Sequence, residues 1–124
     1  MSELLSVRPN FEVTDIEPTV THLCQVFGFS VEVDEPDMGL ALLHRDLVGV
    51  AVVRAAEPAV NETTQCYIGV RDVDDLYVTS VAHGATVVIG LTDHAWGLRD
   101  FVVQLPGGHR VAFGERHLPE EPPA

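Results

Sequence analysis

Apolar and polar residues follow the same order twice along this chain. The segment Phe11–Glu17, which reads FEVTDIE, returns 57 positions later as Ile68–Asp74, which reads IGVRDVD. Each copy shows the alternation typical of a short strand and ends at an Asp. Repetition at a fixed offset predicts a chain built from two like units.

A helix is predicted after each of these strands. Asp15 and Asp72 are suited to cap a helix N-terminus, because a short carboxylate accepts hydrogen bonds from the first free backbone N–H groups. Glycines at positions 28 and 84 fit the left-handed residue that ends a helix. Between cap and glycine, apolar residues recur at the spacing of one helical face: Ile16, Val20, Leu23, Cys24 and Phe27 in the first copy, and Val73, Leu76, Tyr77 and Val81 in the second.

Three further strands are expected in each half. The final pair forms a hairpin, because Leu105–Gly108 supplies proline and glycine between two apolar segments. Each half is therefore predicted to be a βαβββ module in an α+β fold. The modules are expected at residues 5–55 and 65–116, with a linker at 56–64 and a flexible tail at 117–124. The expected strands are Val31–Val33, Gly39–His44 and Leu47–Val53 in the first half, and Thr86–Ile89, Phe101–Val103 and Val111–Phe113 in the second.

Charge and composition narrow the partners. Nineteen acidic residues against seven basic ones give a net charge of -12, which disfavours nucleic acid and anionic membranes and favours cationic partners. The chain has no apolar run long enough for a membrane span and no leader, so a cytoplasmic protein is expected. The two cysteines, Cys24 and Cys66, lie in apolar patterns and are expected to be reduced thiols.

Several motifs together resemble the vicinal oxygen chelate superfamily, which includes glyoxalases, dioxygenases and bleomycin resistance proteins. They are the repeated V-x-D-(I/V)-(E/D), Pro9, Phe27–Ser30, Asp74–Tyr77 and the closing segment Trp96–Glu115, WGLRDFVVQLPGGHRVAFGE. The likeness spans Val7 to Glu115 and is strongest to the bleomycin resistance branch. It implies the glyoxalase/bleomycin resistance fold, in which each module forms an open, cup-shaped sheet that holds a ligand or a metal.

The metal-ligand positions that the resemblance implies are poorly occupied. They fall on Arg8 and Gln65 in the first strands and on Ala112 in the last strand. A fixed guanidinium beside a divalent ion is strongly repelled. The six histidines form no HxxxH or HExxH pair, and no nucleophile is spaced to form a dyad with one. We therefore expect no metal, no cofactor and no catalytic residue.

A binding protein is the expectation that remains. The resemblance implies a homodimer that exchanges its N-terminal strand at Pro9 and binds a drug in grooves at the dimer interface without destroying it. Trp96 matches the family's stacking Trp, Tyr67 an inner-strand aromatic residue, and Met38 the position of a second stacking ring. His44 lies on a predicted strand, and Arg99 and Asp100 lie close to Trp96. The expected ligand is a cationic aromatic small molecule, such as an antibiotic.

Other interpretations stay open. The chain could be a glyoxalase- or dioxygenase-like metalloenzyme with unrecognised ligands, or it could bind an unrelated metabolite. Trp96 is also suited to anchor a dimer interface, Tyr67 to pack in the core, and Met38 to fill a gap in a loop. The acidic residues Asp34, Glu35 and Asp37 are expected in a solvated loop, where they could attract a cation.

Overall fold

The computed structural model describes residues 1–61 and 63–117. The chain divides into two compact units, residues 1–60 and 61–124. Each unit contains one helix and one four-stranded mixed sheet, in the order predicted for a βαβββ module. The α+β fold with two such modules in tandem is therefore confirmed.

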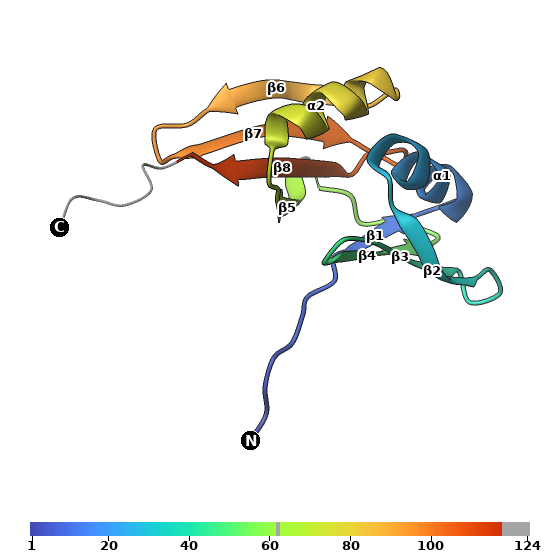
Figure 1. Cartoon of the computed structure of the whole chain (residues 1–124). Helices are drawn as coiled ribbons and strands as arrows, with labels where there is room; N and C mark the ends of the chain where they lie inside the picture. Colours follow the sequence, from blue (N-terminus) through green and yellow to red (C-terminus); the bar gives the residue numbers. More distant parts are fainter. Residues whose placement is uncertain (62, 118–124) are drawn as a thin grey trace. The chain divides into compact units, whose positions relative to one another are not determined.

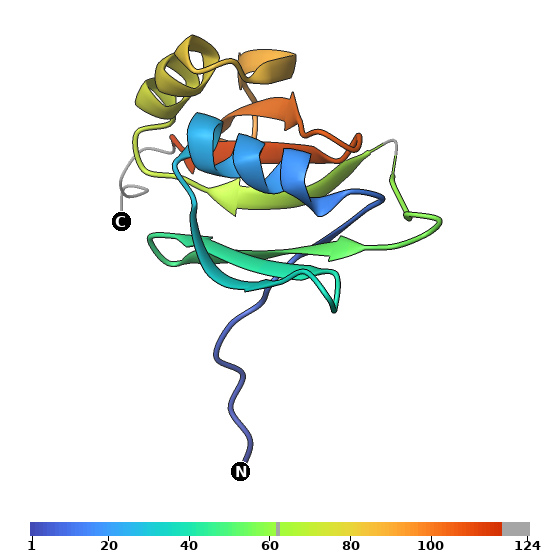
Figure 2. The ribbon, with the colours of Figure 1, turned by 90° about the vertical axis from the view of Figure 1, so that its right-hand side faces the viewer.

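In the first unit the sheet has the strand order β1-β4-β3-β2. β1 pairs in parallel with β4, and the other neighbours are antiparallel. Residues 1–9 precede β1 as an extended segment that leads away from the sheet in Figure 1 and Figure 2. The elements are β1 (Asn10–Val13), α1 (Ile16–Phe27), β2 (Ser30–Glu35), β3 (Leu40–Arg45) and β4 (Val48–Arg54).

The second unit repeats this topology with the order β5-β8-β7-β6, and α2 lies along its sheet (Figure 1). In the parallel pairs, Asn10 pairs with Ala51 in the first unit and Tyr67 pairs with Ala112 in the second. Asn10 and Tyr67 are 57 positions apart, which is the offset of the sequence repeat. The elements are β5 (Thr64–Gly69), α2 (Val73–Ala82), β6 (Thr86–Asp93), β7 (Leu98–Gln104) and β8 (Arg110–Arg116).

The predicted caps explain where both helices begin and end. The Asp15 side chain accepts from the backbone N–H of Glu17, and the Asp72 side chain accepts from that of Asp75. Gly28 ends α1 in the left-handed conformation with φ of 72°. In α2 the capping residue is His83, and Gly84 follows it with φ of 100°. The chain leaves each helix through a conformation that favours glycine.

One face of each sheet packs against its own helix. In the second unit Phe101 and Val103 are fully buried, and the Tyr77 ring of α2 meets Phe101 edge to face, with 5.1 Å between ring centroids. In the first unit Leu43 and Val50 are buried, and Arg45 donates to the carbonyl of Phe27 at the end of α1. Because side chains alternate along a strand, the intervening residues lie on the opposite face.

Several predicted boundaries were wrong. Asp34 and Glu35 belong to β2 and pair with Ala41 and Leu40, so they are strand residues rather than part of a loop with Asp37. Their side chains are exposed, which explains how an acidic segment can still form a strand. The first strand of the second unit, β5, begins at Thr64. Of the predicted flexible tail, residues 118–124 lie outside the described residues.

Neither helix in the described part of the chain is long and apolar enough to cross a membrane.

Glu115 joins β8 to the start of α2, and its removal should lower stability. Its two carboxylate oxygens accept from the backbone N–H groups of Asp72 and Val73, at 2.9 and 3.0 Å. These bonds lower the pKa of Glu115. The charged form is thus favoured by folding, so the stabilisation is complete above the ordinary pKa of about 4.5 and is lost as the pH falls through the lowered value.

We expect Glu115→Gln to melt at a lower temperature than the unmodified chain at pH 7, because Gln offers a single uncharged acceptor oxygen. The gap should narrow as the pH is lowered from 7 to 3, as followed by circular dichroism. Glu3→Gln, in the exposed segment before β1, is the control and should melt like the unmodified chain. An equal gap at pH 7 and pH 3 would contradict the assigned role.

Candidate functional site

A pocket of about 470 Å³ lies on one face of the second sheet, the face that carries Leu98, Asp100 and Val102 of β7. All four strands and the turn between β6 and β7 contribute to it. Apolar side chains dominate the lining, and Tyr67, His94, Trp96 and Asp100 are its large polar or aromatic groups. The lining residues are Thr64, Cys66, Tyr67, Ile89, Thr92, His94, Trp96, Leu98, Asp100, Val102 and Ala112.

The Asp100 carboxylate is the centre of the polar contacts in this pocket. Its Oδ1 lies 2.7 Å from Nε2 of His94, and its Oδ2 accepts from the Tyr67 hydroxyl at 3.0 Å. Only 13% of the Asp100 side chain is exposed. A carboxylate in an apolar pocket needs such partners, because desolvation of an unpaired charge is costly. Two different elements therefore hold Asp100 in place.

Tyr67 reaches Asp100 by lying across a glycine of the neighbouring strand. A Cβ atom at Gly114 would overlap the hydroxyl and ring of Tyr67, so this position of the ring requires glycine. Burial, followed by the hydrogen bond to Asp100 and the charge of that carboxylate, raises the pKa of Tyr67 to about 12, with Arg116 acting in the opposite sense. Tyr67 is therefore a neutral hydrogen-bond donor at physiological pH.

Trp96 lies in the turn between β6 and β7 and stacks on His94. The two ring centroids are 4.4 Å apart and the ring planes differ by 12°. The Trp96 residue is nevertheless 64% exposed. One ring face thus rests on His94, which is itself bound to Asp100, and the indole still offers a large area to a ligand. The geometry is that of a flat stacking surface beside a carboxylate.

The Arg99 side chain lies outside the pocket that Trp96, Tyr67 and Asp100 line. It neighbours Asp100 in β7, and alternation turns its side chain to the opposite face. There its guanidinium forms ion pairs with Asp74 of α2 at 2.8 Å and with Asp93 of β6 at 3.2 Å. The nearer contact, made by Nε, has ion-pair distance without hydrogen-bond geometry. Arg99 therefore links α2 to the sheet edge rather than lining the Trp96 pocket.

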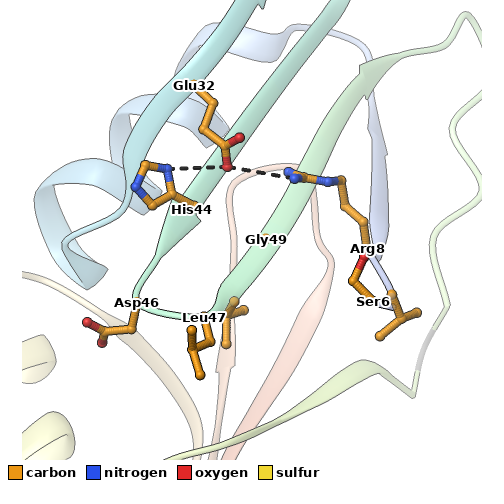
Figure 3. A pocket seen from close by; sticks show the side chains of 9 residues that line it. Ser6, Arg8, Glu32, His44, Asp46, Leu47 and Gly49 are labelled. Carbon is orange, nitrogen blue, oxygen red and sulfur yellow. Dashed lines mark ion pairs between the residues drawn. The ribbon is translucent and has the colours of Figure 1, made fainter. Parts of the chain in front are cut away.

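Met38 and His44 both lie in the first unit. Met38 is 75% exposed in the turn between β2 and β3. His44 lines a second pocket, of about 490 Å³, together with Arg8 and Glu32 (Figure 3). In it Nδ1 of His44 lies 3.2 Å from Oε1 of Glu32, and Nη2 of Arg8 lies 3.7 Å from the same oxygen. The six candidate residues are thus distributed over several surfaces.

Glu32 and Gly114 are parts of these sites that sequence reasoning missed, whereas the position of His94 indicated that it could line a ligand cup. His94 had one usable signal, because it stands two residues before the single Trp. Strand alternation also separates Asp100 from Arg99 as soon as β7 is assigned. Glu32 and Gly114 gave no signal, because their roles depend on contacts with Arg8 and Tyr67 across strands.

The three positions that the family resemblance assigns to metal ligands are Arg8, Gln65 and Ala112. Ala112 lines the Trp96 pocket, Gln65 accepts a hydrogen bond from Asn61 at 3.1 Å, and Arg8 lies across Gly49 in the other unit. Over residues 1–61 and 63–117, no three His, Cys, Asp or Glu side chains come together in a group suited to a metal ion. The residues present do not fit the metal centre that the family resemblance implies.

Cys66 is the remaining candidate nucleophile in the Trp96 pocket. Burial raises the pKa of its thiol to about 11, so the unreactive thiol form prevails near neutral pH. Both Cys24 and Cys66 are free thiols and half-buried. The pocket therefore offers binding groups rather than an activated nucleophile.

We expect the raised pKa of Tyr67 to depend on Gly114. In Gly114→Ala the new methyl group displaces the ring from Asp100, so the pKa of Tyr67 should fall towards the ordinary value of about 10. Absorbance of tyrosinate reports it directly in a Tyr77→Phe background, over the pH range in which circular dichroism shows folded protein. Gly69→Ala is the control, because a Cβ there meets nothing within 4 Å. Identical titrations of the two alanine variants would refute the contact.

The chain was compared with known protein families and structures. Residues 8–113 match the model of the glyoxalase/bleomycin resistance protein/dioxygenase superfamily. No curated protein sequence matches the chain. TioX from Micromonospora sp. ML1 is 33% identical, over 91% of this chain and 100% of its own, with a TM-score of 0.72.

Two further structures share the fold at lower identity. The bleomycin-binding protein from bleomycin-producing Streptomyces verticillus, complexed with copper(II)-bleomycin, is 20% identical over 91% of this chain and 97% of its own, with a TM-score of 0.76. A glyoxalase/bleomycin resistance protein/dioxygenase from Nocardioides is 16% identical over 100% of this chain and 91% of its own, also with a TM-score of 0.76. The family match and the likeness to TioX place this chain in the glyoxalase/bleomycin resistance protein/dioxygenase superfamily.

Proposed function

We propose that the chain is a metal-free, non-catalytic binding protein that sequesters a flat, cationic aromatic small molecule of the antibiotic type. The observation that carries this proposal is the exposed Trp96 ring held beside the buried carboxylate of Asp100. The bleomycin-binding protein of Streptomyces verticillus, which has the same fold, was crystallised with copper(II)-bleomycin, and this supports small-molecule binding as the role.

The physical argument begins with stacking. A flat ring laid on Trp96 gains area burial and roughly 0.5 to 2 kcal/mol from ring and cation–π contact. Since His94 supports the indole from one side, little freedom of the ring remains to be lost on binding. A preformed surface of this kind favours rigid planar ligands over flexible ones.

The carboxylate supplies charge selectivity. Among the described residues, one oxygen of Asp100 is bonded to Tyr67 and the other to His94, and a carboxylate oxygen can accept more than one hydrogen bond. An N–H group on a stacked cation can therefore donate to Asp100 while the bonds from Tyr67 and His94 stay in place. The net charge of -12 further raises the local concentration of cations.

The same residues argue against catalysis. Within the described part of the chain, the pocket holds a thiol with a raised pKa and no cluster of metal-binding side chains. Tyr67 is held as a neutral phenol. We infer that a bound ligand is retained unchanged.

A homodimer is part of the proposal. Leu4, Leu5 and Val7 in the segment before β1 are 98%, 84% and 87% exposed, which is unusual for three apolar side chains so close together. A partner protomer that packs against residues 4–7 would bury these three side chains.

Binding should depend on ligand charge through Asp100. We expect N-methylquinolinium to bind more tightly than quinoline, which has the same ring size and is uncharged at pH 8, in isothermal titration calorimetry. Asp100→Asn should weaken quinolinium binding about tenfold, or ~1.4 kcal/mol, and leave quinoline binding nearly unchanged. Trp96→Ala should weaken both.

Asp93→Asn is the matched control, because Asp93 is paired with Arg99, whose side chain lies on the opposite face. It removes the same charge and should leave both affinities unchanged. Metal-free and copper(II)-loaded bleomycin are the antibiotic probes, read by quenching of the single Trp. The proposal fails if no cationic aromatic compound binds, or if Asp100→Asn binds quinolinium as the unmodified chain does.

Dimerisation should depend on the apolar segment before β1. We expect the unmodified chain to sediment as a dimer at micromolar concentration, and Leu4→Ser/Leu5→Ser to shift towards monomer because the buried apolar area is lost. Ser2→Ala in the same segment is the control. A purely monomeric unmodified chain would exclude a binding groove between protomers and leave the Trp96 pocket to be tested alone.

A further inference from the structure

We propose that the first unit contains a separate binding site for a neutral amide group, formed by the Arg8 guanidinium and the Glu32 carboxylate. The two side chains point toward one another across the pocket that His44 also lines (Figure 3). This site is built from the first unit alone, so it stands whether or not the Trp96 pocket binds a cation.

Arg8 is fixed in position by the sheet. Its Nη1 donates to the carbonyl of Val50 at 3.0 Å and to the carbonyl of Leu43 at 3.2 Å. The guanidinium lies directly over Gly49, where a Cβ atom would come within 2.9 to 3.0 Å of three of its atoms. The absence of a side chain at Gly49 thus makes room for the guanidinium. Arg8 is held by main-chain groups, which side-chain motion elsewhere does not disturb.

The other terminal nitrogen of Arg8 is available to a ligand. Nη2 lies 3.7 Å from Oε1 of Glu32, which is an ion-pair distance and too long for a hydrogen bond. Among residues 1–61 and 63–117 it has no hydrogen-bond acceptor. Two N–H groups of this nitrogen therefore remain to be satisfied by solvent or by a ligand.

Glu32 offers the complementary acceptor. Its Oε1 lies 3.2 Å from Nδ1 of His44, while Oε2 has no hydrogen-bond donor in the described part of the chain. About a third of each side chain, Arg8 and Glu32, is exposed to the pocket and solvent. A fixed donor and an acceptor thus stand side by side with a gap between them.

A neutral amide matches this pair. Its carbonyl oxygen accepts from Nη2 of Arg8, and its N–H donates to Glu32, so both hydrogen bonds are charge-assisted. A carboxylate ligand would be repelled by Glu32 and by the net charge of -12. An ammonium ligand would be repelled by the guanidinium, which cannot move away from Gly49 without losing its carbonyl partners.

The rim of the pocket indicates what carries the amide. Leu47 is fully exposed and lines the pocket next to Val48. Apolar side chains next to an amide-binding pair suit an amide attached to an aliphatic group. The ligand class is therefore an aliphatic carboxamide or a peptide group with an aliphatic neighbour.

The test uses three small probes. N-acetyl-leucinamide is neutral, N-acetyl-leucine carries a carboxylate at one end, and leucinamide carries an ammonium group at the other end. They are titrated into the full ¹⁵N-labelled chain and followed by nuclear magnetic resonance. We expect saturable shifts at the backbone amides of Glu32, His44 and Gly49 with the neutral diamide, and affinities about tenfold weaker with the carboxylate and the ammonium probes.

Three variants perturb the site in different ways. Arg8→Met removes the donor, Glu32→Ala removes the acceptor, and Gly49→Ala displaces the guanidinium without any change of charge. Each should weaken binding of the neutral diamide about tenfold or more. Gly69→Ala in the other unit is the control and should bind normally. Thermal melting checks that each variant is folded, and Glu32→Gln replaces Glu32→Ala if the latter is not.

The proposal is overturned if the neutral diamide causes no saturable shift in the first unit. It is also overturned if either charged probe binds equally well, or if Gly49→Ala and Arg8→Met bind as the unmodified chain does. None of these outcomes affects quinolinium binding at Trp96, so the two sites are tested separately.

Discussion

Each half of this protein depends on the parallel pairing of its first strand with its last strand. The pairing closes the βαβββ module, because it places the end of the first strand, which precedes the helix cap, beside the last strand. It also places a side chain from the N-terminal side of the module across a glycine of the last strand. Arg8 lies over Gly49 in the first unit, and Tyr67 lies over Gly114 in the second. These two glycines make room for Arg8 and Tyr67, which contact the carboxylates of Glu32 and Asp100 in the two pockets.

Each half has a side chain lying over a glycine of its last strand, but the chemistry of that side chain differs between the halves. In the first, the residue over the glycine is a cation, held by the carbonyls of Leu43 and Val50. In the second it is a phenol that remains neutral and donates to Asp100. Divergence within a repeated frame explains why a chain with internal symmetry has pockets of unlike character.

Much of the fold could be predicted from local signals. The caps at Asp15, Asp72 and Gly28 act within a few residues of themselves, and the hairpin at Leu105–Gly108 is set by its own turn residues. The acidic end of β2 was missed, because Asp34 and Glu35 are poor strand formers that only cross-strand pairing holds extended. The sites were harder to predict than the fold. Trp96, Tyr67 and Asp100 line one pocket, but the supporting role of Gly114 arises from its contact with Tyr67, which is distant in sequence.

The Trp96 pocket combines a carboxylate with apolar walls, and under the proposed function this combination bears on ligand selection. Desolvation makes a buried carboxylate costly, and the bonds from Tyr67 and His94 offset part of that cost before any ligand arrives. A cation that binds in this pocket meets the Asp100 carboxylate, which folding has already separated from most of its hydrating water. Less water therefore has to be displaced when the cation binds. The local dielectric is also lower, so the attraction is stronger than at an exposed Asp. Most of the desolvation free energy of Asp100 is thus spent on folding rather than on ligand binding. A neutral ring of the same size gains only the stacking on Trp96.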